Sequence, residues 1–449
     1  MSAPNYLDEL AWRGLLHQYT EGVQAMLAQG PTVGYAGFDP TARSLHVGNL
    51  IPVMGLAHLQ RAGHRPIALV GGGTGMIGDP SGRASERSLN SLEVVEENVR
   101  GIRHQLERFL DFTGARGALM KNNAEWLMSL GAIEFMRDVG KHFTVNYMTA
   151  KDSVKSRLEG GISYTEFSYM LLQAYDYLEL HKREGVRLQV GGSDQWGNIT
   201  AGVELIRRSA GAEAHAVTFP LVTTAAGTKF GKSEAGAVWL DPAQTSPYRF
   251  YQFWINTDDR DVGKYLRFFT LLDRAEIESL DRAVTERPEA RDAQRALALD
   301  VTSRVHGADM TRVAAEASRL AFDRNADPRE FSAGVLESLM QELPSSTVTI
   351  DVGASAASIV AADGTSTKVP LKPVGDGAGL DVLDAFVAAG LVKSKGDARR
   401  LLQQGGLYAN GETISADRAV LTVAGAIHGQ YYVLRKGARE MAIVRLVGA

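Results

Sequence analysis

A short segment around residue 46 carries the groups that a phosphate-binding helix terminus needs. In FDPTARSLHVGNL (38–50), an apolar run ends at Phe38, and His46, Gly48 and Asn49 follow. Proline is tolerated only in the first turn of a helix, so Pro52 predicts a helix that begins near residues 48–51. Its backbone N–H groups and dipole would attract phosphate, with His46 and Asn49 as further donors. A surface loop capped by an asparagine is the competing interpretation.

A second segment, GTKFGKS (227–233), places two lysines in a loop that also contains two glycines. Its end imitates the Walker loop GxxxxGK[ST], but Ala226 stands where the first glycine belongs and no apolar helix follows Ser233. This disfavours a P-loop nucleotide hydrolase. Lys229 and Lys232 could still reach a polyphosphate, although solvated charge is the commoner explanation of such a loop.

The glycine-rich segment GGGTGMIGDPSG (71–82) offers a third possibility. Gly73, Gly75 and Gly78 satisfy the dinucleotide-binding pattern GxGxxG, which requires a helix to open there. A further turn begins at Asp79 instead, so we interpret the match as accidental. We expect a loop in which Asp79 could hold a substrate ammonium group, with a plain glycine turn as the alternative.

A polar stripe runs along the helix predicted around FSYMLLQAYDYLEL (167–180). Glu166, Tyr169, Gln173 and Asp176 recur at spacings of 3, 4 and 3, which places them on one helical face. Such a stripe is usually the solvated face. A phenol, an amide and a carboxylate, in place of the usual Lys and Glu, favour recognition of a small polar ligand.

The elements that must position these groups alternate between strands and helices. Apolar runs at 33–38, 66–71 and 187–192 contain glycine at or next to their last residue and are predicted to be buried parallel strands. Strands separated by helices predict a doubly wound, Rossmann-like α/β sheet, with ligands bound at the carboxyl ends of its strands. An acid in that position, such as Asp194 after Gly191-Gly192, often binds a ribose hydroxyl, although it could equally cap a helix.

The strand pattern stops before residue 246, and helical patterns predict an α-helical region from there to about residue 325. Residues 344–377 are rich in Ser, Thr, Ala, Val and Gly without an aromatic residue, so we expect much of this stretch to be a linker or a small, weakly packed segment. Two short helices and an Asn410-Gly411 hairpin are then predicted. From residue 391 onward the charge is +5, against −4 for the whole chain, which favours a polyanionic partner for this end.

Composition excludes several classes of protein. The 449 residues are 45% hydrophobic and 22% charged, typical of a globular protein, and they contain no cysteine. Disulfide scaffolds, cysteine metal sites and thiol catalysis are therefore ruled out. We see neither a secretory signal nor an apolar stretch that could span a membrane, and we expect a cytoplasmic protein without a membrane partner.

The motifs together resemble a known family. HVGN (46–49) and KFGKS (229–233) are similar to the two ATP signatures of class I aminoacyl-tRNA synthetases, HIGH and KMSKS. With FDPTARSLHVGN, GDPSG, FSYMLLQAYD, GGSDQWGN and SPYRFYQFWINTDDRDV in this order, the chain resembles the bacterial tyrosyl-tRNA synthetases over nearly its whole length.

The resemblance implies a tyrosine site, an ATP site and a reaction. The tyrosine phenol would bind Tyr35 and Asp176, its ammonium group Asp79, Tyr169 and Gln173, and its carboxylate Gln195. Thr41 and His46 would donate to the leaving pyrophosphate, Asp194 would bind the ribose, and Lys229, Lys232 and Ser233 would close over the triphosphate. Further ATP contacts would come from Gly37, Asp39, Gly48, Asn49 and Gly192. The implied chemistry is formation of tyrosyl-adenylate from L-tyrosine and ATP, followed by transfer of tyrosine to the 3′ end of tRNA(Tyr).

The resemblance also implies the partners and the domains. ATP would be a substrate with Mg²⁺ on its triphosphate, and neither a tightly bound cofactor nor a protein metal site is expected. The expected assembly is a homodimer. The domains would be a catalytic domain (1–233), a helical anticodon-side domain (234–330), a linker (331–378) and a small α+β RNA-binding domain similar to one in a ribosomal small-subunit protein (379–449).

Departures and alternatives remain. Asn49 replaces the second histidine of HIGH, for which we expect an altered ribose contact, and Pro52 removes a backbone donor. The alternatives are a tryptophanyl-tRNA synthetase, a non-catalytic RNA-binding protein that keeps the fold, and an NAD-dependent dehydrogenase. Tyr35 with Asp176 argues against the first alternative, because an indole offers a donor but no phenol.

Overall fold

The computed structural model describes residues 5–448 other than 82–89, 156–157, 159, 229, 234–235, 351–354, 362, 375–376, 416–418 and 438. The chain divides into two compact units. The first contains residues 1–246 and 253–306, and the second contains residues 247–252 and 307–449. Among the described residues, no helix is long and apolar enough to cross a membrane.

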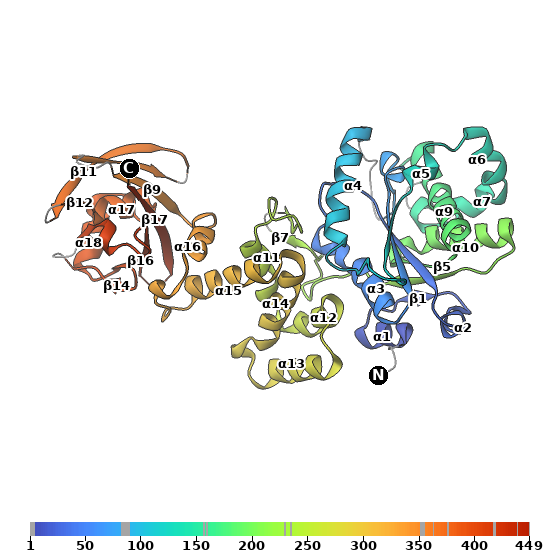
Figure 1. Cartoon of the computed structure of the whole chain (residues 1–449), viewed down its shortest axis with the longest axis horizontal. Helices are drawn as coiled ribbons and strands as arrows, with labels where there is room; N and C mark the ends of the chain where they lie inside the picture. Colours follow the sequence, from blue (N-terminus) through green and yellow to red (C-terminus); the bar gives the residue numbers. More distant parts are fainter. Residues whose placement is uncertain are drawn as a thin grey trace. The chain divides into compact units, whose positions relative to one another are not determined.

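The first unit is built on a six-stranded sheet (Figure 1). Its strands, in spatial order, are β1 (Gln18–Tyr19), β6 (His215–Phe219), β5 (Val186–Gly192), β2 (Val33–Phe38), β3 (Arg65–Val70) and β4 (Leu119–Asn122). All neighbours pair in parallel except β1 with β6. The chain continues from β2 to β3 on one side and later returns to β5 on the other. This reversal beside β2 is where open α/β sheets bind ligands. The doubly wound sheet predicted from the sequence is confirmed.

Helices cover both faces of this sheet (Figure 1). They are α1 (Tyr6–Arg13), α2 (Val23–Ala28), α3 (Leu50–Arg61), α4 (Leu92–Leu106), α5 (Ala124–Leu127), α6 (Ala132–Asp138), α7 (Val145–Thr149), α8 (Asp152–Lys155), α9 (Tyr164–Glu184) and α10 (Trp196–Ala210). Helix α3 begins at Leu50, so Pro52 lies in its first turn as predicted. It lies close to the sheet because Gly55 has no Cβ, which would otherwise sit 2.1 Å from the Phe219 ring.

The helices predicted after residue 246 are present, but the separate helical domain predicted over 234–330 is divided: residues 253–306 belong to the first unit and residues 307–330 to the second. The helices are α11 (Pro247–Ile255), α12 (Asp259–Phe269), α13 (Arg274–Glu286), α14 (Asp292–His306) and α15 (Ala308–Phe322). Between β6 and α11 lies the hairpin of β7 (Lys232–Ser233) and β8 (Gly236–Ala237).

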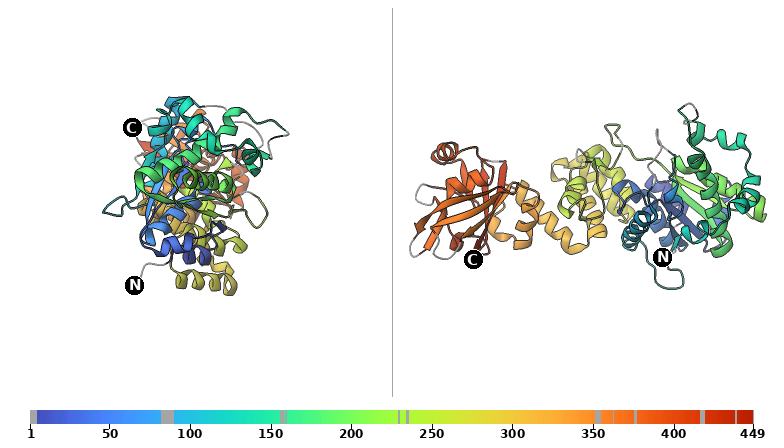
Figure 2. Two further views of the ribbon diagram at one scale, coloured as in Figure 1. Left: turned by 90° about the vertical axis from the view of Figure 1, so that its right-hand side faces the viewer. Right: turned by 90° about the horizontal axis from the view of Figure 1, so that it is seen from above.

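The second unit contains a nine-stranded sheet, seen as the orange and red arrows of Figure 2. In spatial order its strands are β14 (Glu412–Thr413), β13 (Leu407–Ala409), β16 (Tyr431–Lys436), β17 (Glu440–Gly448), β9 (Ser345–Ile350), β10 (Ala356–Ala361), β11 (Ser366–Val374), β12 (Gly377–Asp381) and β15 (Val420–Leu421). Only β17 and β9 pair in parallel among these described strands.

Side chains alternate between two cores on β16. Tyr432 and Leu434 belong to the core that includes residues of α17 (Val382–Ala388) and α18 (Lys395–Gln403). Tyr431 and Val433 belong to a second core, which includes residues of α15 and α16 (Ala333–Met340). This period of two follows from strand geometry and explains why both faces of the strand are apolar.

The prediction of a linker over residues 331–378 is wrong. This stretch forms α16 and strands β9, β10, β11 and the beginning of β12, all part of the second unit. Val348, Ala357 and Ile359 are fully buried, although the segment is poor in large apolar residues.

The hairpin at Asn410-Gly411 is confirmed, since both residues have positive φ, 49° and 85°, as a type I′ turn requires.

Candidate active site

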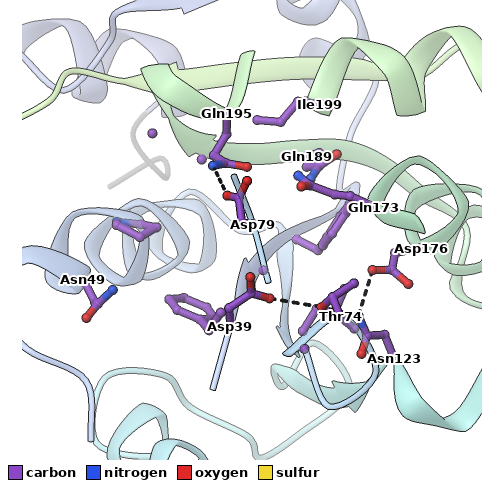
Figure 3. A pocket seen from close by; sticks show the side chains of 18 of the residues that line it. Asp39, Asn49, Thr74, Asp79, Asn123, Gln173, Asp176, Gln189, Gln195 and Ile199 are labelled. Carbon is purple, nitrogen blue, oxygen red and sulfur yellow. Dashed lines mark hydrogen bonds between the residues drawn. The ribbon is translucent and has the colours of Figure 1, made fainter. Parts of the chain in front are cut away.

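A cavity of about 270 Å³ opens at the carboxyl ends of the parallel strands. Residues from the ends of three strands reach it: Phe38 at the end of β2 with Asp39 after it, Gly71 after β3, and Gly192 at the end of β5. Twelve of the site residues predicted from the sequence line this cavity: Tyr35, Gly37, Asp39, Thr41, His46, Asn49, Asp79, Tyr169, Gln173, Asp176, Gly192 and Gln195. Figure 3 shows how several of them lie around it.

One end of the cavity holds a buried carboxylate with two donors. Asp176 accepts hydrogen bonds from Trp126 Nε1 at 2.7 Å and from Asn123 Nδ2 at 2.9 Å. Burial raises the pKa of Asp176 to about 7, although both donors act to lower it. The Tyr35 hydroxyl is also buried and has no partner among the described residues. Burial and the Asp176 charge raise the pKa of Tyr35, so it stays protonated and can donate.

A chain of hydrogen bonds joins Asp176 to the middle of the cavity (Figure 3). Asn123 Nδ2 also donates to Thr74 Oγ1 at 2.9 Å, and Thr74 Oγ1 donates to Asp39 at 3.0 Å. The Tyr169 hydroxyl donates to the other oxygen of Asp39 at 2.7 Å. Burial, with the nearby charges of Asp39 and Asp79, raises the pKa of Tyr169 well above its usual value. The hydrogen-bond network therefore fixes the carboxylates of Asp39 and Asp176.

A third carboxylate, that of Asp79, contacts Gln195 just after the end of β5. Asp79 accepts from Gln195 Nε2 at 2.7 Å and from the backbone N–H of Ser81 at 2.9 Å. Gln195 Oε1 in turn accepts from Asn198 at 3.2 Å. Gln173 lines the cavity between this pair and Asp176, and its Oε1 is buried without a partner among the described residues. These oxygens can accept from a cation while Gln195 remains a donor.

The opposite end carries His46 immediately before the 3₁₀ turn Val47–Asn49. His46 Nδ1 accepts from the Gly48 N–H at 3.1 Å, and Asn49 Oδ1 accepts from the His46 N–H at 3.0 Å. Because Nδ1 is an acceptor, neutral His46 carries its ring proton on Nε2, which is thus the donor nitrogen. A Cβ on Gly48 would lie 2.9 Å from the imidazole Cε1, so glycine is required for this geometry.

The other predicted site residues either do not line the cavity or lie outside the residues that the structure describes. Gly48 supports His46, as above. Asp194 lies in the 3₁₀ turn Ser193–Gln195, where its Oδ1 is 2.5 Å from the position of a Cβ on Gly192. Lys229 lies outside the described residues, and for Lys232 and Ser233 only the backbone, in β7, is described.

Sequence reasoning missed Thr74, Asn123 and Trp126. Asn123 and Trp126 follow β4, a half-buried four-residue strand without a strong apolar pattern. Both are themselves buried, which is unusual for asparagine. No spacing relates them to Asp176, which lies 53 and 50 positions further along the chain.

The parallel sheet, the HIGH-like turn at residues 46–49 and the KMSKS-like segment 229–233, which we call the lysine loop, are features of a class I tRNA synthetase. The family model "tRNA synthetases class I (W and Y)" matches residues 27–323. A second model, "Tyrosine--tRNA ligase SYY-like C-terminal domain", matches residues 363–444.

Individual proteins similar to this chain show which branch of the class it belongs to. The tyrosine–tRNA ligase of Anaeromyxobacter dehalogenans is 54% identical over 442 residues, covering 98% of this chain and 99% of the relative. That of Bacillus caldotenax is 49% identical over 443 residues, with the same coverage. A solved C-terminally truncated mitochondrial tyrosyl-tRNA synthetase of Aspergillus nidulans has a TM-score of 0.65 and 31% identity, covering 71% of this chain and 94% of that one. The chain belongs to the tyrosine–tRNA ligase family.

Proposed function

We propose how the described site performs the reaction of this family, in which ATP activates L-tyrosine and the tyrosyl group is then transferred to tRNA(Tyr). Asp176 accepts a hydrogen bond from the tyrosine phenol, and Tyr35 donates to the phenol oxygen. Asp79, Tyr169 and Gln173 receive the ammonium group. The observation that carries this assignment is the buried Asp176 carboxylate, held by two donors beside a buried hydroxyl in one cavity.

Activation is an attack of the tyrosine carboxylate on the ATP α-phosphate. The new bond joins a carboxylate oxygen to phosphorus, and the bond to the bridging oxygen of pyrophosphate breaks. Gln195 orients the carboxylate, while Thr41 and His46 donate to the leaving pyrophosphate. No covalent bond to the enzyme is needed, so catalysis consists of positioning and charge stabilisation.

The nucleotide is assigned to the other end of the cavity. Asp194 would bind the ribose, with Asn49 nearby in place of the usual histidine. Gly37, Gly48 and Gly192 would let the backbone approach the nucleotide, and Asp39 would hold Tyr169 at the junction of the two substrates. Lys229, Lys232 and Ser233 would close over the triphosphate, which carries Mg²⁺ as part of the ATP substrate.

The second unit is proposed to bind tRNA. Its support is the +5 charge from residue 391 onward, with Lys395, Arg399 and Arg400 exposed on α18. In this proposal the helices after residue 246 lie on the anticodon side of the tRNA. We also propose that the enzyme works in the cytoplasm.

A homodimer is proposed on the basis of an apolar surface in the first unit. Helix α6 has no buried residue, and Ile133 and Met136 on it are 74% and 51% exposed. Val145 on α7 is 66% exposed. Apolar side chains gathered on exposed helices are typical of an interface. Light scattering should show a dimer that Ile133→Glu converts to monomer.

The function is tested by ATP–pyrophosphate exchange with each of the twenty amino acids. Only tyrosine should support exchange, and charging should follow with tRNA(Tyr). Exchange supported by tryptophan instead would overturn the tyrosine assignment, and absence of exchange with every amino acid would favour a non-catalytic RNA-binding role.

A further inference from the structure

The segment that follows the lysine loop pairs directly with the segment that contains His46. The Val47 N–H donates to the Val238 carbonyl at 2.9 Å, and the Leu240 N–H donates to the Leu45 carbonyl at 2.9 Å. Between these bonds, His46 and Trp239 face each other as an antiparallel bridge. The two ATP motifs are therefore connected by a short two-stranded ladder.

Within this ladder the Trp239 indole contacts the His46 imidazole. The ring centroids lie 5.8 Å apart with an interplanar angle of 65°, an edge-to-face arrangement. The Gly48 N–H already fixes the Nδ1 side of the imidazole at 3.1 Å. The indole adds a second, independent restraint on the direction in which Nε2 points.

Trp239 is well placed to act as a fixed support. Its backbone N–H donates to Thr245 Oγ1 at 3.0 Å, and Thr245 is buried. Its neighbours Val238 and Leu240 are also buried, with exposures of 4% and 2%. The indole is thus attached to a segment with buried neighbours, and without the indole the imidazole would keep the hydrogen bond at its Nδ1 but lose the contact with Trp239.

The same segment closes the lysine loop. The Val238 N–H donates to the Gly231 carbonyl at 3.1 Å, and a Cβ on Gly231 would lie 2.9 Å from Val47 Cγ2. At the other end, Phe230 is buried in an aromatic cluster, with its ring centroid 4.9 Å from those of Tyr265 and Phe269. Trp239 therefore stands where the end of the lysine loop meets the histidine.

We propose that Trp239 is a positioning residue that holds the His46 imidazole with Nε2 directed at the leaving pyrophosphate. This inference rests on the proposed function of His46. An edge-to-face pair contributes enough to change a rate about two- to tenfold. Because the contact matters only where His46 acts, its loss should lower kcat for tyrosine activation and leave the KM for tyrosine unchanged.

The test is a double-mutant cycle in tyrosine-dependent ATP–pyrophosphate exchange. Trp239→Ala should lower kcat about two- to tenfold, and Trp239→Phe should restore most of it. In a His46→Ala background, Trp239→Ala should have no further effect, because the group that it positions is absent. Tyr19→Ala, which removes an exposed aromatic ring on β1 outside the cavity, serves as the control with unchanged activity.

Two results would overturn the proposal: an equal loss from Trp239→Ala with and without His46, or a raised KM for tyrosine without a change in kcat. If Trp239→Ala does not fold, the cycle is completed with Trp239→Phe and Trp239→Leu. A wild-type enzyme that shows no tyrosine-dependent exchange contradicts the proposed function itself. That outcome is distinct from a failure of the cycle.

Discussion

Replacing Trp126 with phenylalanine tests how Asp176 is kept ionised. The substitution keeps an aromatic ring but removes the Nε1 donor at 2.7 Å, which leaves only Asn123 at 2.9 Å. Burial already raises the pKa of Asp176 to about 7, and the two donors counteract this effect. We therefore expect Trp126→Phe to raise the pKa of Asp176 further and to favour its protonated form.

The size of this effect follows from the energy of the lost bond. A hydrogen bond to a charged group contributes about 1.5–3 kcal/mol, and a tenfold change in protonation equilibrium corresponds to about 1.4 kcal/mol. Loss of the bond should therefore raise the pKa of Asp176 and favour its protonated form by a further factor of about 10 to 100. At pH 7 the ionised fraction falls from about one half to about 1–10%. Because the substrate phenol donates to the ionised form, kcat/KM for tyrosine should fall about five- to fiftyfold.

The assay is ATP–pyrophosphate exchange with tyrosine, measured from about pH 6 to pH 9. The wild-type enzyme should gain activity through pH 7, and the variant should recover most of its loss toward pH 9. Ser129→Ala is the matched control, since its hydroxyl donates to the Trp126 carbonyl and not to Asp176. An inflection that stays at the wild-type pH in Trp126→Phe would refute the reasoning.

Three further outcomes are expected. Asp176→Ala should abolish tyrosine-dependent exchange, and near-normal exchange would contradict its assignment to the phenol. Gly231→Ala should slow activation more than Gly227→Ala. Both glycines have positive φ, 83° and 78°, a conformation that costs alanine about 1–2 kcal/mol at either position. Only at Gly231 would the added Cβ also lie against the Val47 side chain. Equal losses in these two variants would count against the contact. Deleting residues 345–449, which removes the whole nine-stranded sheet, should spare exchange and weaken tRNA charging; equal loss of both steps would argue against separate roles for the two units.

The sequence was sufficient for elements whose signals are local. Pro52 located the start of α3, and Asn410-Gly411 located a hairpin, because each residue type restricts its own backbone. The polar stripe of α9 was also recognisable. Its helical spacing requires Tyr169 and Asp176 to share a face, whatever that face contacts.

Features that depend on distant parts of the chain could not be predicted. Strand β9 has a modest apolar content, and its parallel pairing with β17 joins residues almost one hundred positions apart. Trp126 and Asn123 reach Asp176 only because the segment after β4 packs against α9 in the folded protein. Both the strand pairing and these side-chain contacts depend on tertiary structure, which no local sequence pattern predicts.

The order in which the strands are joined also affects how the protein can fold during its synthesis. The first sheet has all its strands once Phe219 has been made, so this sheet can assemble while the rest of the chain is still being translated. In the other sheet β17 lies between β16 and β9. Its earlier strands must therefore wait, with an open edge, until residues 440–448 leave the ribosome. During that interval the nascent chain exposes an unpaired strand edge, the kind of surface through which incompletely folded chains aggregate.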